Sequence, residues 1–392
     1  MTAIDFKARF SQRIQQVQTP IIPQVGEWVR QNPGTLSLGQ GVSYYGPPKE
    51  SYDAVEQHLH DQDIYRYGPV EGIPELRQAL RDKLETQNGI APDEQTDIVV
   101  TAGSNMAFNT IVLALGDTDD EFILPIPYYF NHEMAITMAG CKPVLVDTLE
   151  DYHLDLDALK AAITSKTKAI VTVSPNNPTG AVYTKEELVA VNQLCKKHGI
   201  YHISDEAYED FTYGDHEHFS PATLENSQKH TISLFSFSKA YGFAGWRIGY
   251  MLIPQHLKAS VKKIQDTILI SPTMISQYAA IGALQAGPQF IHEKLKPLRE
   301  IRDEIVTALN EIQTIESTHA EGAFYAFIKL RSDQNDLELV QQLVQSHGIA
   351  MIPGSAFGTH DGCFLRISYG ALEQKDLSEA INRLKQGLSS VS

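Results

Sequence analysis

The sequence predicts an α/β protein with a mostly parallel seven-stranded sheet in a large domain, accompanied by a smaller α+β domain. Three observations support this prediction. The chain has 392 residues, which exceeds one typical hydrophobic core and favours two domains. Between about 95 and 255, short β-branched runs alternate with amphipathic segments, as is typical of βα units. After about 255, long helical stretches precede a few short strands, so the second part has a different architecture.

Seven apolar runs in the first part are predicted strands. They are Asp97–Thr101, Glu121–Leu124, Pro143–Val146, Ala169–Val173, Tyr201–Ser204, Thr231–Phe235 and Arg247–Leu252. Helices are expected between several of them, and one begins at a capping box that starts with Thr184 and ends at Gly199. Because alternating β and α units give a parallel sheet covered on both faces, we expect ligands at the carboxyl ends of the strands.

The second part is predicted to be helical from about 256 to 315, with a final helix near 373–388. Its predicted strands are Ala323–Lys329, Ile349–Ile352 and Phe364–Ile367. The chain has no P-loop, and no GxGxxG follows the early strands. This argues against NTPases and dinucleotide-binding enzymes.

The composition is that of an ordinary globular enzyme with an acidic balance. The formal net charge is −16, with 42% hydrophobic and 20% charged residues and no basic block. We therefore predict that neither nucleic acid nor an anionic membrane is a partner. The polar first 16 residues and the lack of any apolar run near 18 residues predict a cytoplasmic protein without a signal peptide or membrane span.

The three cysteines, Cys141, Cys195 and Cys363, are scattered and show no CxxC spacing. This usage suits a reducing compartment and argues against a disulfide framework. It also argues against a zinc site, and we expect no metal.

Lys239 has the most informative surroundings of any residue. It lies in SFSKAYGFAGWR, residues 236–247, between apolar runs at 232–235 and 248–253. A hydrated ammonium is costly in such a place, and burial lowers the pKa of a lysine. A neutral amine is a nucleophile that can form a Schiff base with an aldehyde. The ordinary alternative is a solvated lysine in a surface loop.

Several further short motifs accompany the predicted strands. In chain order they are LGQG (38–41), YGPVEGIPELR (67–77), AGSN (102–105), PYYF (127–130), SPNNPTG (174–180), SDEAY (204–208) and FLRISY (364–369). Together with SFSK, they resemble the motifs of the class I and II aminotransferases, in the aspartate aminotransferase superfamily of fold type I. The resemblance extends from about Leu38 to Tyr369. It implies pyridoxal 5'-phosphate (PLP) as the cofactor, and Lys239 as the catalytic residue that binds it covalently and carries the substrate Cα proton.

The resemblance also implies a binding site for the cofactor phosphate. Gly103, Ser104 and Asn105 lie where a predicted strand runs into a helix, and a helix N-terminus offers free N–H groups to an anion. Ser236 and Arg247 occupy the family's positions for further phosphate contacts, and a guanidinium is suited to phosphate. An ordinary strand-to-helix turn and a surface arginine are the alternatives.

Four residues match the family's contacts to the cofactor ring. Asp205 follows the predicted strand at 201–204, where a carboxylate can keep the pyridine nitrogen protonated. Tyr208 and Asn177 match the contacts to the phenolic oxygen. Tyr129 matches the aromatic side chain stacked on the ring, although many relatives carry tryptophan or phenylalanine there. The alternatives are a turn-forming aspartate, a Pro-Gly turn that only shapes the backbone, and core aromatic residues.

The substrate α-carboxylate has its own matching residues. Arg366, in FLRISY, matches the arginine that binds this carboxylate through two parallel hydrogen bonds. Gly41 matches the loop whose backbone contacts the same group, and Asn177 is expected to contact the substrate as well. The alternative for Arg366 is a solvated side chain on the outer face of a strand.

We therefore expect a PLP-dependent aminotransferase that moves an amino group from an amino acid to a 2-oxo acid by a ping-pong mechanism. Tyr67 matches a tyrosine that the second subunit contributes to the phosphate, which implies a homodimer with shared active sites. No arginine or lysine lies between Gly41 and Tyr45, which favours a neutral amino donor, aromatic or methionine, with 2-oxoglutarate as a plausible acceptor. Tyr44 and Tyr45 either contact this donor or only pack a Pro-Gly turn.

Two other functions stay open at this point. A carbon–sulfur lyase or another eliminating enzyme can use the same fold, because fold does not determine reaction type. The alternative of another class is a non-catalytic ligand-binding regulator. We expect the large PLP-binding domain to comprise residues 40–285. The family architecture implies that residues 1–39 pack with residues 286–392 as the small domain.

Overall fold

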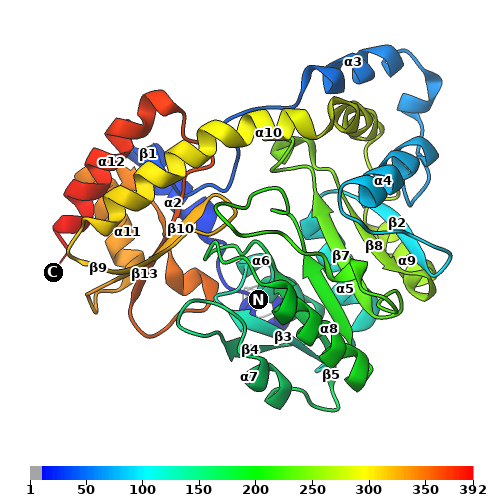
Figure 1. Cartoon of the computed structure of the whole chain (residues 1–392), viewed down its shortest axis with the longest axis horizontal. Helices are drawn as coiled ribbons and strands as arrows, with labels where there is room; N and C mark the ends of the chain where they lie inside the picture. The colour runs from blue at the N-terminus through cyan, green and yellow to red at the C-terminus, as the bar shows by residue number, and fades with distance from the viewer. Residues whose placement is uncertain (1–10, 392) are drawn as a thin grey trace, which may run out of the picture.

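The computed structural model describes residues 11–391, so the first ten residues of the polar N-terminal segment lie outside the described part. Its centre is a seven-stranded sheet with the order β2-β8-β7-β6-β5-β3-β4 (Figure 1). The strands are β2 (Thr96–Thr101), β3 (Glu121–Ile126), β4 (Lys142–Asp147), β5 (Thr167–Val173), β6 (Tyr201–Asp205), β7 (Thr231–Ser236) and β8 (Gly249–Pro254). The predicted fold class, α/β with a mostly parallel seven-stranded sheet, is confirmed.

One strand of this sheet runs against the others. β8 pairs antiparallel with both β2 and β7, whereas the remaining neighbours pair in parallel. The carboxyl ends of the other six strands and the amino end of β8 therefore lie along the same edge. Loops that leave these strands are brought together there, as expected for a ligand site on an α/β sheet.

Helices cover both faces of the large sheet. They include α4 (Pro74–Thr86), α5 (Ser104–Leu115), α6 (Phe130–Ala139), α7 (Leu156–Ala161), α8 (Lys185–His198) and α9 (Lys258–Ile268). The alternation of side chains along β5 shows the two layers. Val171 belongs to the buried cluster that contains Phe108 of α5, whereas its neighbour Ile170 belongs to the cluster that contains Leu188 of α8. As predicted, α8 ends at Gly199, which is left-handed with φ of +68°.

The C-terminal part contains a four-stranded antiparallel sheet with the order β12-β13-β10-β9. The strands are β9 (Ile315–His319), β10 (Tyr325–Leu330), β12 (Ile352–Pro353) and β13 (Cys363–Ser368), and helices α11 (Asp336–His347) and α12 (Gln374–Ser389) accompany them. The N-terminal segment joins this part. β1 (Leu36–Ser37) pairs in parallel with β11 (Ile349–Ala350), and α2 (Ile21–Gln31) contacts α11. The bounds of the two domains stay a prediction.

Helix α10 (Met274–Asn310), yellow in Figure 1, runs along the molecule from α3 (Lys49–His58) to α12 and contacts both. Its helical geometry is interrupted at Gly287, whose φ of +70° and ψ of −173° only glycine adopts readily. A short helix, α1 (Gln12–Gln16), contacts α6.

Two predicted strands differ in the structure. The strand predicted at Arg247–Leu252 begins only at Gly249, because Arg247 is left-handed (φ +53°) after a 3-10 turn at Ala244–Trp246. The strand predicted at Ile349–Ile352 is divided between two sheets, since β11 pairs with β1 and β12 with β13. The edge strand β9 was not predicted. Only its first residue is fully buried, so its sequence lacks a clear apolar alternation.

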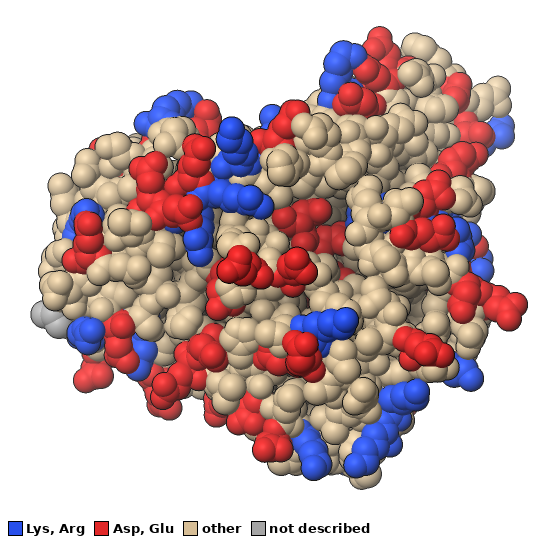
Figure 2. All heavy atoms as spheres, viewed as in Figure 1, with Lys and Arg blue, Asp and Glu red and all other residues tan. Residues whose placement is uncertain are grey.

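Figure 2 shows more Asp and Glu than Lys and Arg on the displayed face, with both signs interspersed. This distribution accords with the formal net charge of −16. Within residues 11–391, no helix is long and apolar enough to cross a membrane.

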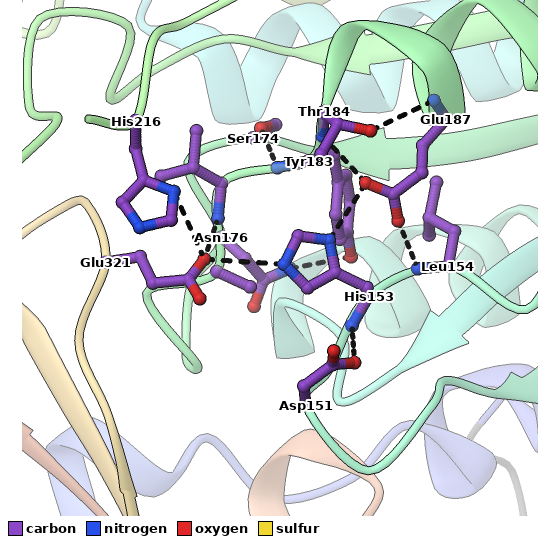
Figure 3. A network of polar contacts seen from close by, with 12 residues as sticks. Asp151, His153, Leu154, Ser174, Asn176, Tyr183, Thr184, Glu187, His216 and Glu321 are labelled. Atoms are coloured by element: carbon purple, nitrogen blue, oxygen red, sulfur yellow. Dashed lines mark hydrogen bonds and ion pairs between the residues drawn. The ribbon is translucent and has the colours of Figure 1, made fainter.

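A polar network joins the turn before β10 to the start of α8 (Figure 3). His153 Nδ1 lies 2.9 Å from Glu187 Oε2, and His153 Nε2 lies 3.5 Å from Glu321 Oε2. Glu187 also accepts hydrogen bonds of 2.7 Å from the backbone N–H groups of Leu154 and Thr184, the latter as part of the predicted capping box. Hydrogen bonds with Glu187 and Glu321 raise the pKa of His153 to about 10, so the imidazole is cationic at neutral pH.

We expect Glu187→Ala to destabilise the protein by about 1–3 kcal/mol, because one substitution removes the helix cap and the partner of His153. Glu186→Ala is the matched control, since Glu186 lies exposed in the same helical turn. It should change stability by less than about 0.5 kcal/mol. Chemical denaturation followed by circular dichroism measures both variants, and equal effects would contradict the role assigned to Glu187.

Candidate active site

The residues predicted from the motifs follow strands that end at one edge of the large sheet. Ser104 begins α5 after β2, Tyr129 follows β3, and Asn177 follows β5. Asp205 is the last residue of β6, and Lys239 lies three residues after the end of β7. Arg247 precedes the antiparallel strand β8 and therefore reaches the same edge from the opposite chain direction.

The Lys239 side chain is partly buried, and its amine donates a hydrogen bond of 2.5 Å to the carbonyl of Gly41. Burial, together with the positive charges of Arg366 and Arg247, lowers the pKa of Lys239 to about 8, while Asp205 opposes the shift. At pH 7 about a tenth of such an amine is neutral, far more than for an ordinary lysine. The amine is therefore suited to attack a carbonyl compound and to exchange protons near neutral pH.

Arg366 is a buried cation, with only 2% of its surface exposed. Its Nη1 donates to Asn177 Oδ1 at 2.8 Å, and its Nη2 donates to the carbonyl of Gly39 at 2.6 Å. The guanidinium lies over the rings of Tyr325, at 4.6 Å, and Phe357, at 5.0 Å.

Among the residues that the structure describes, no carboxylate forms an ion pair with Arg366, and its buried Nε has no hydrogen-bond partner. An unpaired buried charge is costly. A carboxylate ligand would neutralise it, and a guanidinium can bind such a ligand through two parallel hydrogen bonds.

Asp205 is a buried carboxylate, with 4% of its surface exposed. Its Oδ1 accepts a hydrogen bond from the backbone N–H of Ala207, and its Oδ2 lies 3.1 Å from His132 Nε2. Across residues 11–391, neither lysine nor arginine forms an ion pair with it. The carboxylate is therefore available to a cationic group of a ligand.

His132 is a residue that the sequence prediction missed. It is 1% exposed, stacks on Phe108 with ring centroids 3.9 Å apart, and meets the Tyr129 ring edge-on at 5.2 Å. These contacts hold the imidazole against Asp205. The available signal was its position in the first turn of α6, directly after a strand whose end carries a predicted site residue.

The N-terminus of α5 and Arg247 form a cradle for an anion. Gly103 caps the helix at φ of +86°, and a Cβ added there would lie 2.6 Å from Arg247 Nη2, so only glycine fits. Arg247 is held by hydrogen bonds to the carbonyls of Ala244, at 2.8 Å, and Ala102, at 3.3 Å. Ser104 is the first residue of the helix. Free N–H groups of the first helical turn and a guanidinium favour a phosphate or similar anion.

The other predicted residues differ in how they are placed. Tyr208 is buried and its hydroxyl lies 2.5 Å from that of Tyr325, a second residue that the sequence prediction missed.

Ser236 accepts a hydrogen bond of 3.1 Å from the backbone N–H of Ser238. Asn105 is exposed in the first turn of α5. Tyr67 is 80% exposed and makes no hydrogen bond or ring contact within residues 11–391, so the single chain does not bring it into the cluster.

The structure also bears on metal binding. The sequence contains two His-x-His pairs, 58/60 and 216/218. In the second pair, His216 lies 3.9 Å from Glu321 and His218 lies 3.0 Å from Glu206. Within the described part of the chain, no group of three or more His, Cys, Asp or Glu side chains could hold a metal ion.

Comparison with known proteins places this geometry in a family. The model of the family described as aminotransferase class I and II matches residues 33–384. The chain belongs to this family. The aromatic aminotransferase ISS1 of Arabidopsis thaliana is 35% identical over 390 residues, which cover 96% of each chain. The aspartate aminotransferase of Pyrococcus abyssi is 34% identical over 358 residues, covering 90% of this chain and 91% of the relative.

Solved structures of aminotransferases match the whole chain. The Thermus thermophilus aspartate aminotransferase with maleate has a TM-score of 0.86 at 31% identity, and covers 97% of this chain and 99% of its own. The aromatic aminotransferase of Pyrococcus horikoshii OT3 has a TM-score of 0.85 at 34% identity, covering 92% and 98%. This aminotransferase is a PLP-dependent enzyme whose substrates are amino acids and 2-oxo acids.

The residues at the sheet edge fit this cofactor. The buried Asp205 lacks a lysine or arginine partner, the α5 cradle suits a phosphate, and the amine of Lys239 has a lowered pKa. A group with a pyridine nitrogen, a phosphate and an aldehyde would satisfy all three features.

Proposed function

We propose that this aminotransferase transfers the amino group of a neutral, bulky amino acid, aromatic or methionine, to a 2-oxo acid by a ping-pong mechanism. Lys239 is its catalytic residue. The observation that carries the proposal is the pairing of a lysine of lowered pKa with a buried arginine, Arg366, whose charge no carboxylate of the described chain neutralises. The amine would move the proton at the substrate Cα, and the guanidinium would bind the carboxylate attached to that carbon.

The cofactor contacts follow from the charges of the site. The first turn of α5, at Gly103 to Asn105, would hold the phosphate together with Ser236 and Arg247. Asp205, whose carboxylate lies beside His132, would hold the proton of the pyridine nitrogen. Bound PLP then supplies an electron sink for the electron pair that remains when a Cα proton is removed.

Three further side chains would orient the cofactor ring. Tyr208 would donate a hydrogen bond to the phenolic oxygen, and Asn177 would contact the same atom while its Oδ1 accepts from Arg366. Tyr129 would stack on the ring, and its hydroxyl already accepts a hydrogen bond of 2.7 Å from Asn131.

The proton transfers are assigned to one atom, the Nζ of Lys239. A pKa of about 8 allows this amine to take the Cα proton and to return it near neutral pH. Arg366 and the backbone at Gly41 would hold the substrate carboxylate during the transfer, which keeps the Cα beside the amine. The bound cofactor would keep the amino group in the site when the first product leaves, which is what a ping-pong mechanism requires.

The apolar surroundings of residues 39–42, the loop expected to contact the substrate carboxylate, support the donor preference. A cavity of about 310 Å³ lies between α2 and residues 39–42, and Val25, Val29 and Ile352 contribute apolar walls. Ile352 pairs with Arg366 across the sheet, so both side chains project from the same face. The charged side chain at this cavity, Arg30, is exposed and pairs with Glu27. A second substrate carboxylate thus finds no buried cation at this cavity.

The hydroxyl groups of Tyr44 and Tyr45 form hydrogen bonds within the chain, which favours the alternative that these residues pack the loop. The Tyr45 hydroxyl donates to the backbone carbonyls of Lys239 and Ala240, each at 3.2 Å, and the Tyr44 hydroxyl donates to the carbonyl of Lys294 at 3.2 Å. Both polar tips are therefore used within the chain. Any contact of these residues with a donor would come from the ring faces.

We expect Lys239→Ala to lower turnover by at least about 10³-fold, because it removes the covalent anchor and the proton carrier together. Lys197→Ala, at an exposed position on α8, is the control and should keep wild-type turnover. Turnover is measured with a saturating amino acid and 2-oxoglutarate after circular dichroism has shown that both variants fold. Wild-type-like turnover of Lys239→Ala would overturn the proposed function.

The second prediction concerns the donor. With one acceptor, kcat/KM for phenylalanine and methionine should exceed the value for aspartate by at least about tenfold, because a second carboxylate would be buried without a cation. Alanine serves as the small neutral control. Analysis of the products for the swapped amino group, against free ammonia, separates transfer from elimination. An aspartate value well above the others would contradict the preference.

The third prediction concerns a homodimer with shared sites, which is supported by exposed apolar side chains near α3 and the start of α10. Tyr65 and Tyr67 are 77% and 80% exposed, and Ile268 and Ile275 are exposed at the end of α9 and the start of α10, a helix that contacts residues 62–65. We expect sedimentation to show a dimer. Lys239→Ala and Tyr67→Ala subunits, once mixed and allowed to exchange, should regain activity, since the hybrid has one site with both native residues. A fully active monomer, or no gain on mixing, would argue against shared sites.

A further inference from the structure

Tyr325, the first residue of β10, contacts three of the residues assigned to the reaction. Its hydroxyl lies 2.5 Å from the hydroxyl of Tyr208, and its ring carries the guanidinium of Arg366 at 4.6 Å. A Cβ added at Gly41 would lie 2.2 Å from the Tyr325 hydroxyl oxygen, so the glycine leaves the space that this hydroxyl occupies. The side chain is 1% exposed.

We propose that Tyr325 is a positioning residue that couples the cofactor contact Tyr208 to the carboxylate contact Arg366. The inference rests on the proposed function, because it assigns those two roles to Tyr208 and Arg366. Tyr325 acts through its hydroxyl on one partner and through its ring on the other. The two actions can therefore be removed separately.

The hydroxyl action follows from counting protons. Each hydroxyl carries one donor proton and can accept through its oxygen. If Tyr208 gives its proton to the cofactor phenolic oxygen, the short contact requires Tyr325 to donate to the Tyr208 oxygen. A hydroxyl that accepts a hydrogen bond becomes a stronger donor, because hydrogen bonds in a chain polarise one another. Tyr325 would thus strengthen the hydrogen bond from Tyr208 to the cofactor.

The ring action concerns the geometry of Arg366. The guanidinium carbon of Arg366 lies over the ring faces of Tyr325 and Phe357, 4.6 and 5.0 Å from their centroids. A cation over an aromatic face is stabilised without being neutralised, so it keeps its charge for an anionic ligand. The ring of Tyr325 therefore holds Arg366 in place while leaving its donors free to bind a carboxylate.

Tyr325→Phe tests the hydroxyl and keeps the ring. The nitrogen that joins Lys239 to the cofactor titrates with a change in visible absorbance, and withdrawal of electrons from the phenolic oxygen lowers its pKa. A weaker Tyr208 hydrogen bond should raise the titration midpoint of the substrate-free holoenzyme by about 0.3 to 1 pH unit. In a Tyr208→Phe background the same substitution should give no further shift, as expected for a residue that acts through Tyr208.

Tyr325→Leu tests the ring. The affinity of the holoenzyme for 3-phenylpropanoate and for succinate, which carry a carboxylate but no amine, should fall about 3- to 30-fold in this variant. In Tyr325→Phe the affinity should stay within about twofold of the wild type. Two ligands are used so that the result does not depend on the donor preference.

Tyr250→Phe is the control for loss of a buried tyrosine hydroxyl. Tyr250 is 2% exposed, and its hydroxyl has no hydrogen-bond partner in the described part of the chain. The Tyr250→Phe substitution should leave the titration midpoint and the affinities for both carboxylate ligands unchanged. An unchanged midpoint in Tyr325→Phe, or a shift that persists in the Tyr208→Phe background, would overturn the coupling. If the wild type shows no absorbance change that depends on Lys239, the proposed function itself fails.

Discussion

The unneutralised charge of Arg366 is the constraint on which the rest of the site depends. The guanidinium is buried where β13 of the four-stranded sheet meets the loops of the large sheet, and it donates to Asn177 and to Gly39. These hydrogen bonds join an arginine of the C-terminal part to a loop after β5 and to the N-terminal segment. Burial lowers the pKa of Lys239, and the charge of Arg366 lowers it further. Binding a carboxylate would remove much of this effect, so substrate binding and the protonation of the amine are linked through one electrostatic interaction.

The large sheet makes this arrangement possible because of its strand directions. The parallel strands deliver Asp205, Asn177 and Lys239 to one edge, and the antiparallel β8 delivers Arg247 to the same edge from the other direction. Two glycines leave space for side chains of the site: Gly103 leaves room for Arg247, and Gly41 leaves room for Tyr325. Side chains at either position would displace a group that the site uses, which explains why both motifs contain glycine.

Sequence reasoning predicted most of the fold and the residues that directly follow strands, because both depend on local patterns. The alternation of apolar runs identified the large sheet, and short motifs identified Lys239, Asp205 and Arg366. It placed Arg247 in a strand, since apolar neighbours conceal a left-handed turn. His132 and Tyr325 were missed because their importance arises from contacts with residues 73 and 117 positions away, at Asp205 and Tyr208. Such contacts leave no local signal. Tyr67 is 80% exposed, so the single chain does not test the role that the resemblance implies for it.

The local charges of the site also explain how an acidic protein can take anionic substrates. The chain carries a formal charge of −16, and Figure 2 shows acidic groups over the displayed face. In water these surface charges are screened within roughly 10 Å at moderate salt. Arg366 is buried and Lys239 is partly buried, and interactions in such a less polar environment are stronger and less screened. The affinity for a carboxylate is therefore expected to depend mainly on Arg366 and little on the surface charge. The proposed donor preference therefore rests on the lining of the α2 cavity, where the described residues contribute no buried cation, and the overall charge does not enter it.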